Sequence, residues 1–172
     1  WWQTDHSLAL LNHGRVVWQL NFLQEEGKPF FHPLSLSDGT ELTWLRPPDH
    51  PWHRALWFSW KYINDVNYWE EDKTTGLSEG LSEITGVNIT RQDDYSAQAV
   101  LNIQYHPPGE PVVLKEKRLL HIYQPENDGS YYIDWESNFQ ALERCTLDRT
   151  PIEGEENGVS WGGYAGLSVR LA

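Results

Sequence analysis

Apolar and polar residues alternate along several stretches of the chain, which is the pattern of β-strands with one buried face. In residues 15–23 the apolar side chains that share one face are Val16, Trp18, Leu20 and Phe22. The 3.6-residue period of an amphipathic helix is nearly absent. The pattern predicts strands at residues 15–23, 29–36, 55–60, 80–90, 97–105, 112–123, 131–142 and 160–171.

Turn-forming residues separate these stretches. Pro107-Pro108-Gly109 and the Gly-rich residues 153–158 lie between predicted strands, and Asn127-Asp128-Gly129 is a hairpin signal between two long ones. Many short strands with closely spaced turns favour an all-β, antiparallel β-sandwich over an alternating β/α fold. No repeat, linker or boundary divides the chain, so we expect a single β-sandwich domain over residues 1–172.

Composition narrows the classes of partner. The formal net charge is −12, which disfavours nucleic acid and anionic membrane surfaces, and no apolar stretch is long enough for membrane insertion. Ten tryptophans indicate a Trp-rich core or a ligand surface. Cys145 is the only cysteine and is expected to be a small buried residue on a strand. The oligomeric state and the compartment stay open, and a periplasmic or secreted location after leader removal is compatible with the sequence.

Residues 46–57 hold the densest set of chemically useful side chains. Three prolines in this segment favour a stiff, extended loop that can fix side chains in space. Histidine serves as a general acid or base near neutral pH, and the arginine fork suits hydroxyls and carboxylates. The structural alternative is that these residues only hold the loop and that His53 packs on Trp57. The candidate residues are Asp49, His50, His53, Arg54 and Trp57.

Two further sets have the composition of sugar sites, in which polar groups bind hydroxyls and aromatic rings face the C–H surface. Asn67 and Trp69 form the first, and the alternative for them is a polar turn followed by a core tryptophan. The acidic residues 70–72 that follow are expected to be a solvated charge run. The second set is Glu153, a candidate carboxylate base in a Gly-flanked loop or simply an exposed residue, with Trp161 and Tyr164.

A metal site is a weaker reading of the histidines. His32, His50 and His53 are weak candidate ligands, and Asp49 could add a carboxylate. A His-x-x-His spacing in a Pro-rich loop is little evidence, so no metal and no cofactor are predicted.

The chain resembles the bacterial family often labelled "PmoA-like". The resemblance is carried by Gly27-Lys28-Pro29-Phe30-Phe31-His32-Pro33-Leu34, Asp49-His50-Pro51-Trp52-His53-Arg54-Ala55-Leu56-Trp57-Phe58, Asn67-Tyr68-Trp69, Thr150-Pro151-Ile152-Glu153-Gly154 and the stretch from Trp161 to Arg170. These motifs span nearly the whole chain in the family's order. They say little about the reaction.

The resemblance implies a galactose-mutarotase-like supersandwich, with two large antiparallel sheets and a concave face for sugar. By the same resemblance His50 and His53 correspond to acid/base histidines, and Glu153 to a carboxylate base. Two residues depart from the family pattern, since Trp52 stands where a histidine is usual and Ala55 where a glycine is usual. Family members usually continue beyond the position of Ala172, which leaves open a C-terminal truncation of the sandwich.

Three functions follow as hypotheses. The first is a carbohydrate-active enzyme, either mutarotase- or epimerase-like or a glycoside hydrolase or lyase, that uses His/Glu acid–base chemistry. The second is a non-catalytic carbohydrate-binding domain in which the histidines are structural. The third is a metal-dependent enzyme built on the three histidines. The predicted partner in the first two is a carbohydrate ligand.

Overall fold

The computed structural model describes residues 1–172, and nearly all of its regular structure is β-strand. The one helical element is the short 3-10 turn η1 (Gln24–Glu26). The strands are β1 (Trp2–Gln3), β2 (Ser7–Asn12), β3 (Arg15–Asn21), β4 (Phe30–Leu34), β5 (Leu56–Ser59), β6 (Tyr62–Ile63), β7 (Val66–Asn67), β8 (Leu81–Arg91), β9 (Ala97–His106), β10 (Leu114–Ile122), β11 (Ile133–Ala141), β12 (Leu147–Asp148) and β13 (Gly166–Val169).

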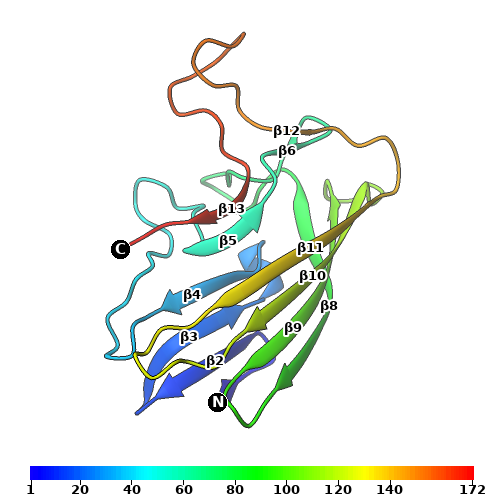
Figure 1. Cartoon of the computed structure of the whole chain (residues 1–172). Coiled ribbons are helices and arrows are strands. Elements are labelled where there is room, and N and C mark those ends of the chain that lie inside the picture. The colour runs from blue at the N-terminus through cyan, green and yellow to red at the C-terminus, as the bar shows by residue number, and fades with distance from the viewer.

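The strands form three antiparallel sheets (Figure 1). The first has six strands in the order β1-β2-β3-β4-β5-β13, and the second has four in the order β11-β10-β9-β8. A small third sheet has the order β12-β6-β7. The all-β, antiparallel architecture predicted from the alternation is therefore confirmed.

The two larger sheets face each other across one apolar core, as in a β-sandwich. Phe31 of the six-stranded sheet has its ring 6.3 Å from Trp18 in the same sheet and 6.3 Å from Trp135 in the other. Leu101 and Ile103 of β9 close the core from the second sheet and are almost fully buried. Burial of large apolar side chains is the main contribution to the stability of such a fold.

A charged cluster interrupts the apolar inner face of the four-stranded sheet. Glu116 and Arg118 lie on β10 with side-chain exposures of 0% and 1%. The Glu116 carboxylate accepts hydrogen bonds from Arg118, Tyr105 and Ser137, and the Arg118 guanidinium lies over the ring of Trp135. The charges are tolerated in the core because they are paired.

The hydrophobic pattern predicted the long strands more accurately than the short ones. Residues 97–105 and 131–142 correspond to β9 and β11, but β2 was not predicted because its sequence is apolar on both faces. Cys145 was expected on a strand and lies instead half-buried in the loop before β12.

The last predicted strand, residues 160–171, is wrong in extent. Only β13 is extended, because Gly163 adopts a φ of +96° and the backbone turns there. A Cβ at Gly162 would lie 2.1 Å from the carbonyl oxygen of Pro151, so this glycine allows the loop to fold tightly on itself. The segment between β12 and β13 projects beyond the sandwich (orange to red in Figure 1).

Strand β5 connects the core to a second cluster on the outer face of the six-stranded sheet. Leu56 points inward and packs against the main core. Its neighbour Trp57 points to the opposite face, where it is buried with Phe30 and Trp69. This outer cluster supports the candidate site.

Candidate functional site

A row of aromatic and imidazole rings rises from the outer cluster to the surface. The ring of Trp57 lies 5.4 Å from that of Trp69 and 5.1 Å from that of His53. His50 stacks on His53 at 4.7 Å with an interplanar angle of 24°, and Trp52 meets His50 edge-on at 5.3 Å. The row brings both predicted histidines together at the surface.

Two consecutive turns place these histidines. The amide of His50 donates to the carbonyl of Pro47 at 2.9 Å, and the amide of His53 donates to the carbonyl of His50 at 3.0 Å. The amide of Arg46 closes the loop by donating to the carbonyl of His53 at 2.9 Å. Proline favours such turns because its φ is already fixed, which is why the Pro-rich sequence gives a defined loop.

Asp49 orients the outer histidine. Its carboxylate lies 2.8 Å from Nδ1 of His50 and 2.9 Å from Nη2 of Arg170. The hydrogen bond to His50, with the nearby Arg170 charge, lowers the pKa of Asp49, so the carboxylate is ionised and only accepts hydrogen bonds. Nδ1 of His50 is therefore the donor, and in the neutral ring Nε2 carries the free lone pair.

His53 has a different environment. Burial, together with the neighbouring His50 and Arg170, lowers its pKa to about 4. Its Nδ1 is buried and has no hydrogen-bond partner among the protein groups. His53 is thus a neutral imidazole at neutral pH, held as the inner neighbour of His50.

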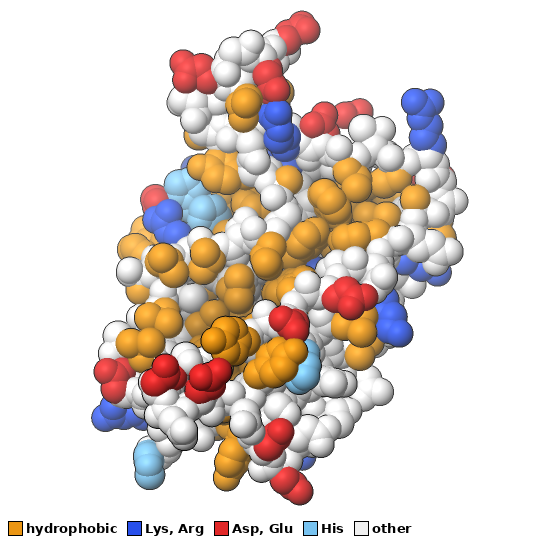
Figure 2. All heavy atoms as spheres, viewed as in Figure 1, with side chains coloured by type: hydrophobic (Ala, Val, Ile, Leu, Met, Phe, Trp, Pro, Cys, Tyr) orange, Lys and Arg blue, Asp and Glu red, His pale blue; other side chains and the backbone are white.

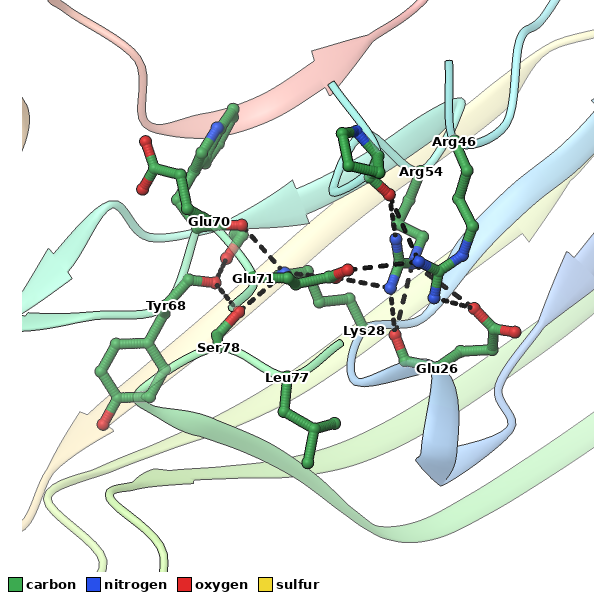
Figure 3. Close-up of polar contacts among 12 residues, drawn as sticks. Glu26, Lys28, Arg46, Arg54, Tyr68, Glu70, Glu71, Leu77 and Ser78 are labelled. Carbon is green, nitrogen blue, oxygen red and sulfur yellow. Dashed lines mark hydrogen bonds and ion pairs between the residues drawn. The ribbon is translucent and has the colours of Figure 1, made fainter. Parts of the chain in front are cut away.

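Arg54 does not contact a ligand as predicted, because its guanidinium points into the protein (Figure 3). The side chain has 0% exposure, and Nη2 lies 2.5 Å from Glu71 and 2.8 Å from the carbonyl of Glu26. Nη1 donates to the carbonyl of Pro51 at 3.2 Å. The substrate-binding prediction for Arg54 is therefore wrong. Arg54 instead holds the 46–57 loop through Glu71 and the carbonyls of Glu26 and Pro51, and we call this set of contacts the Arg54 clamp.

Glu71 is the centre of this clamp and was missed in the sequence. It was expected in a solvated charge run, but its side chain is only 6% exposed and also accepts from Lys28 at 3.4 Å and Arg46 at 3.2 Å. Lys28 donates further to the carbonyl of Trp69 at 3.1 Å. Desolvation lowers the pKa of Lys28 to about 8, and the Glu71 carboxylate opposes this shift. Because Glu71 stands between two other acidic residues, nothing in the local sequence shows that its side chain is the buried one.

Trp57, Trp69 and Asn67 are also corrected from ligand contacts to internal supports. The two tryptophans have exposures of 2% and 3%, so neither presents a ring face to solvent. The Asn67 side chain accepts from the amide of Trp69 at 2.8 Å and donates to Glu70 at 2.7 Å, so its polar atoms are occupied.

Other aromatic residues take the exposed positions. Tyr164 is 52% exposed, and its ring stacks on Trp69 at 6.3 Å. Trp44, which the sequence analysis missed, is 44% exposed and lies under the guanidinium of Arg170 at 5.7 Å. Because Arg170 also binds Asp49, the Asp49 end of the Asp49–His50 pair is bordered by Arg170 and Trp44, and the His50 end by the rings of Trp52 and His53.

Glu153 and Trp161 are both exposed on the projecting segment between β12 and β13. Neither makes a hydrogen bond, ion pair or ring contact with His50 or His53, so the proposed His/Glu153 pair is not assembled here. The carboxylate that organises this segment is Glu155, which binds Arg149 at 2.8 and 2.9 Å and has its pKa lowered to about 2.

The family model that matches residues 7–172 describes a family of unknown function, DUF6807. The chain belongs to this family. No curated protein and no solved structure matches it. No helix in the structure has the length and apolar character needed to cross a bilayer.

The three histidines suggested as weak metal ligands do not converge in this DUF6807 chain. His32 lies on β4, where Nδ1 is 3.2 Å from the hydroxyl of Thr43 and Nε2 is 3.6 Å from Glu41. No group of three or more His, Cys, Asp or Glu side chains in the structure is arranged to hold a metal ion. The weak candidate set of His32, His50 and His53 is therefore not assembled, and only His50 and His53 lie together.

Proposed function

We propose that this protein acts on a carbohydrate, with Asp49, His50 and His53 at the reacting centre. The observation that carries the proposal is the stacked imidazole pair at 4.7 Å, set in a surface bordered by tryptophan and tyrosine rings. The resemblance of the same loop to the "PmoA-like" family, and through it to the mutarotase-like supersandwich, supports the same proposal.

Aromatic rings supply the binding surface in this proposal. A pyranose presents a flat C–H face, which packs on an exposed ring while its hydroxyls reach polar side chains at the edge. Trp52, Trp44 and Tyr164 replace Trp57 and Trp69 in this role, because Trp52 is half-exposed and Trp44 and Tyr164 are exposed, whereas Trp57 and Trp69 are buried. Arg170 and Asp49 lie beside them and are available to sugar hydroxyls.

His50 is the general base in the proposed reaction. Asp49 holds its Nδ1–H, so Nε2 is free to accept a proton from a sugar hydroxyl, and the resulting imidazolium is stabilised by the carboxylate. The protonated ring can then return the proton to a sugar oxygen. This assignment moves the carboxylate partner from Glu153 to Asp49.

Non-catalytic sugar binding is the second candidate. It is favoured by the absence of Glu153 from the imidazole pair, which leaves Asp49 as the only carboxylate hydrogen-bonded to either ring. In that case the aromatic surface holds the ligand and the Asp49–His50 contact only stiffens the loop. The two candidates differ in pH dependence, since acid–base catalysis gives a rate that follows ionisation of the imidazole, whereas binding to neutral hydroxyls changes little.

The test is a panel of neutral and uronic mono- and oligosaccharides, read by quenching of tryptophan fluorescence. A saturable response in the wild type, lost in Trp52→Ala and kept in Trp161→Ala, supports a site on the ring row. NMR of the anomeric signals of the bound sugar then detects conversion. A response that survives Trp52→Ala, Trp44→Ala and Tyr164→Ala in combination would place the sugar elsewhere.

A further inference from the structure

The two edges of the four-stranded sheet differ in how they are protected. The β8 edge has a register shift between Ile84 and Gly86, and such bulges discourage pairing with another strand. The β11 edge pairs with β10 in an unbroken register from Ile133 to Ala141, contains no proline, and has no strand on its other side. A long, regular, unpaired edge is a template for strand addition.

The backbone groups available on β11 follow from its bonds to β10. The amide of Leu142 donates to Val113, and the carbonyl of Tyr132 accepts from Tyr123. In an antiparallel ladder alternate residues face the same neighbour, so the even-numbered residues from 132 to 142 bond to β10. The odd-numbered residues from 133 to 141 therefore direct their N–H and C=O groups to the open side.

The sequence of β11 is complementary to itself when a second copy runs antiparallel about Ser137. In this register each odd residue faces another odd residue, so all the free backbone groups find partners. The acidic residues avoid each other, since Glu136 faces Asn138 and Asp134 faces Gln140. A shift of the twofold axis by one residue, to residue 136, would instead put Glu136 opposite its own copy.

The apolar side chains match in the same register. On the inner face Trp135 lies opposite Phe139, which is 38% exposed in the single chain. On the outer face Tyr132, 60% exposed, lies opposite Leu142, 47% exposed. Cross-strand aromatic and aliphatic pairs stabilise antiparallel sheets. Each pair occurs twice about a twofold axis.

Hydrophobic side chains are also gathered on the face of the molecule that carries this edge (Figure 2). Phe139 contacts Phe58 of the opposite sheet at 5.7 Å, and Leu167 and Val169 of β13 are 54% and 53% exposed. Apolar surface next to an open edge is typical of a protein interface.

We propose that a second copy of this chain pairs with the first through β11, antiparallel and about a twofold axis at Ser137. The two four-stranded sheets then form one continuous eight-stranded sheet. Each copy carries a net charge of −12, so repulsion opposes the association and salt screens it. The dimer therefore becomes tighter as ionic strength rises.

Sedimentation equilibrium of the whole chain, over a range of concentrations and salt, tests the proposal. The wild type is expected to dimerise, more tightly in high salt. Asn138→Glu places a carboxylate opposite Glu136 at two points and is expected to raise the dissociation constant at least tenfold. The matched control is Asn102→Glu, which adds the same charge to an exposed residue of β9, away from the edge.

A double variant tests the register itself. Glu136→Lys combined with Asn138→Glu places opposite charges across the interface and is expected to restore the affinity lost in Asn138→Glu. Circular dichroism checks that each variant is folded. A wild type that stays monomeric at all concentrations, equal effects of Asn138→Glu and Asn102→Glu, or a double variant without rescue would each overturn the proposal.

Discussion

The inner and outer sides of the loop from residue 46 to 57 differ in how their charged and titratable side chains are exposed and hydrogen-bonded. On the inner side Arg54 is fully buried, and its donors meet Glu71 and the carbonyls of Glu26 and Pro51. On the outer side His50 is 44% exposed and keeps one ring nitrogen free. The guanidinium that was predicted to contact a substrate holds the loop instead, whereas the imidazole edge of His50 faces solvent.

The difference has an energetic reason. A buried charge without a partner loses its hydration, so the protein surrounds it with fixed acceptors and cannot offer it to a ligand. A half-exposed imidazole loses little hydration and can exchange water for a ligand. Changes on the inner side should therefore affect folding, and changes on the outer side should affect function.

Glu71→Ala tests the inner side with the largest expected effect. It leaves Lys28 and Arg54 without their shared carboxylate in a buried site, and we expect a loss of about 3–5 kcal/mol in the free energy of unfolding, measured by urea denaturation. Glu156→Ala, at an exposed carboxylate, is the control and should change stability by less than about 0.5 kcal/mol. Equal values for the two variants would contradict the clamp.

His50→Gln tests the outer side. Glutamine keeps a donor for Asp49 but cannot accept and release a proton, so turnover of a confirmed sugar substrate should fall by about 10²–10⁴-fold. Stability in urea should stay within about 0.5 kcal/mol of the wild type. Glu153→Gln should leave turnover unchanged, and a loss there equal to that in His50→Gln would restore Glu153 as the base.

Arg54→Lys separates charge from geometry in the clamp. Lysine keeps the positive charge but lacks the planar fork, so some of the bonds to Glu71, Glu26 and Pro51 are lost. We expect a loss of about 1.5–3 kcal/mol in the free energy of unfolding, the value of a hydrogen bond to a charged group. A lysine variant as stable as the wild type would mean that charge alone holds the loop.

His53→Phe has the smallest expected effect and appears as a change in pH dependence. The folded-state pKa is about 4, below the ordinary value near 6.5, so the unfolded chain binds more protons between these limits. Stability is complete above pH 6.5 and falls as the pH drops toward 4. The variant should lose less stability than the wild type between pH 7 and 5, measured by thermal unfolding, and an unchanged slope would contradict the buried neutral imidazole.

The alternation of residues was enough to predict the sandwich class, because burial of one face imposes a period of two on strands such as β9 and β10. The loop at residues 46–57 and its two histidines were also predicted, although the prediction was an extended path and the structure has two consecutive turns. The exposure of single residues could not be predicted. Glu71 differs from its acidic neighbours only because Lys28, Arg46 and Arg54, from distant parts of the chain, bind it.

The exposure of the aromatic residues could not be predicted from the sequence either. A tryptophan on a strand has the same local sequence signal whether it faces a core or a ligand, and Trp57 faces the outer cluster only because β5 pairs with β4 in a particular register. Trp44 comes to the surface under Arg170, and Tyr164 comes to the surface on Trp69, through loops whose path depends on the whole fold.

The most direct test of a sugar site at His50 and His53 is the NMR spectrum of the histidine ring nitrogens. It is recorded while a sugar that quenches tryptophan fluorescence in the panel is added. We expect the signals of His50 and His53 to move together and saturate, while those of His32 on β4 and His106 on β9 stay in place. Assignment comes from His50→Gln and His53→Gln. Saturable binding of a sugar that leaves the signals of His50 and His53 unmoved would contradict the site.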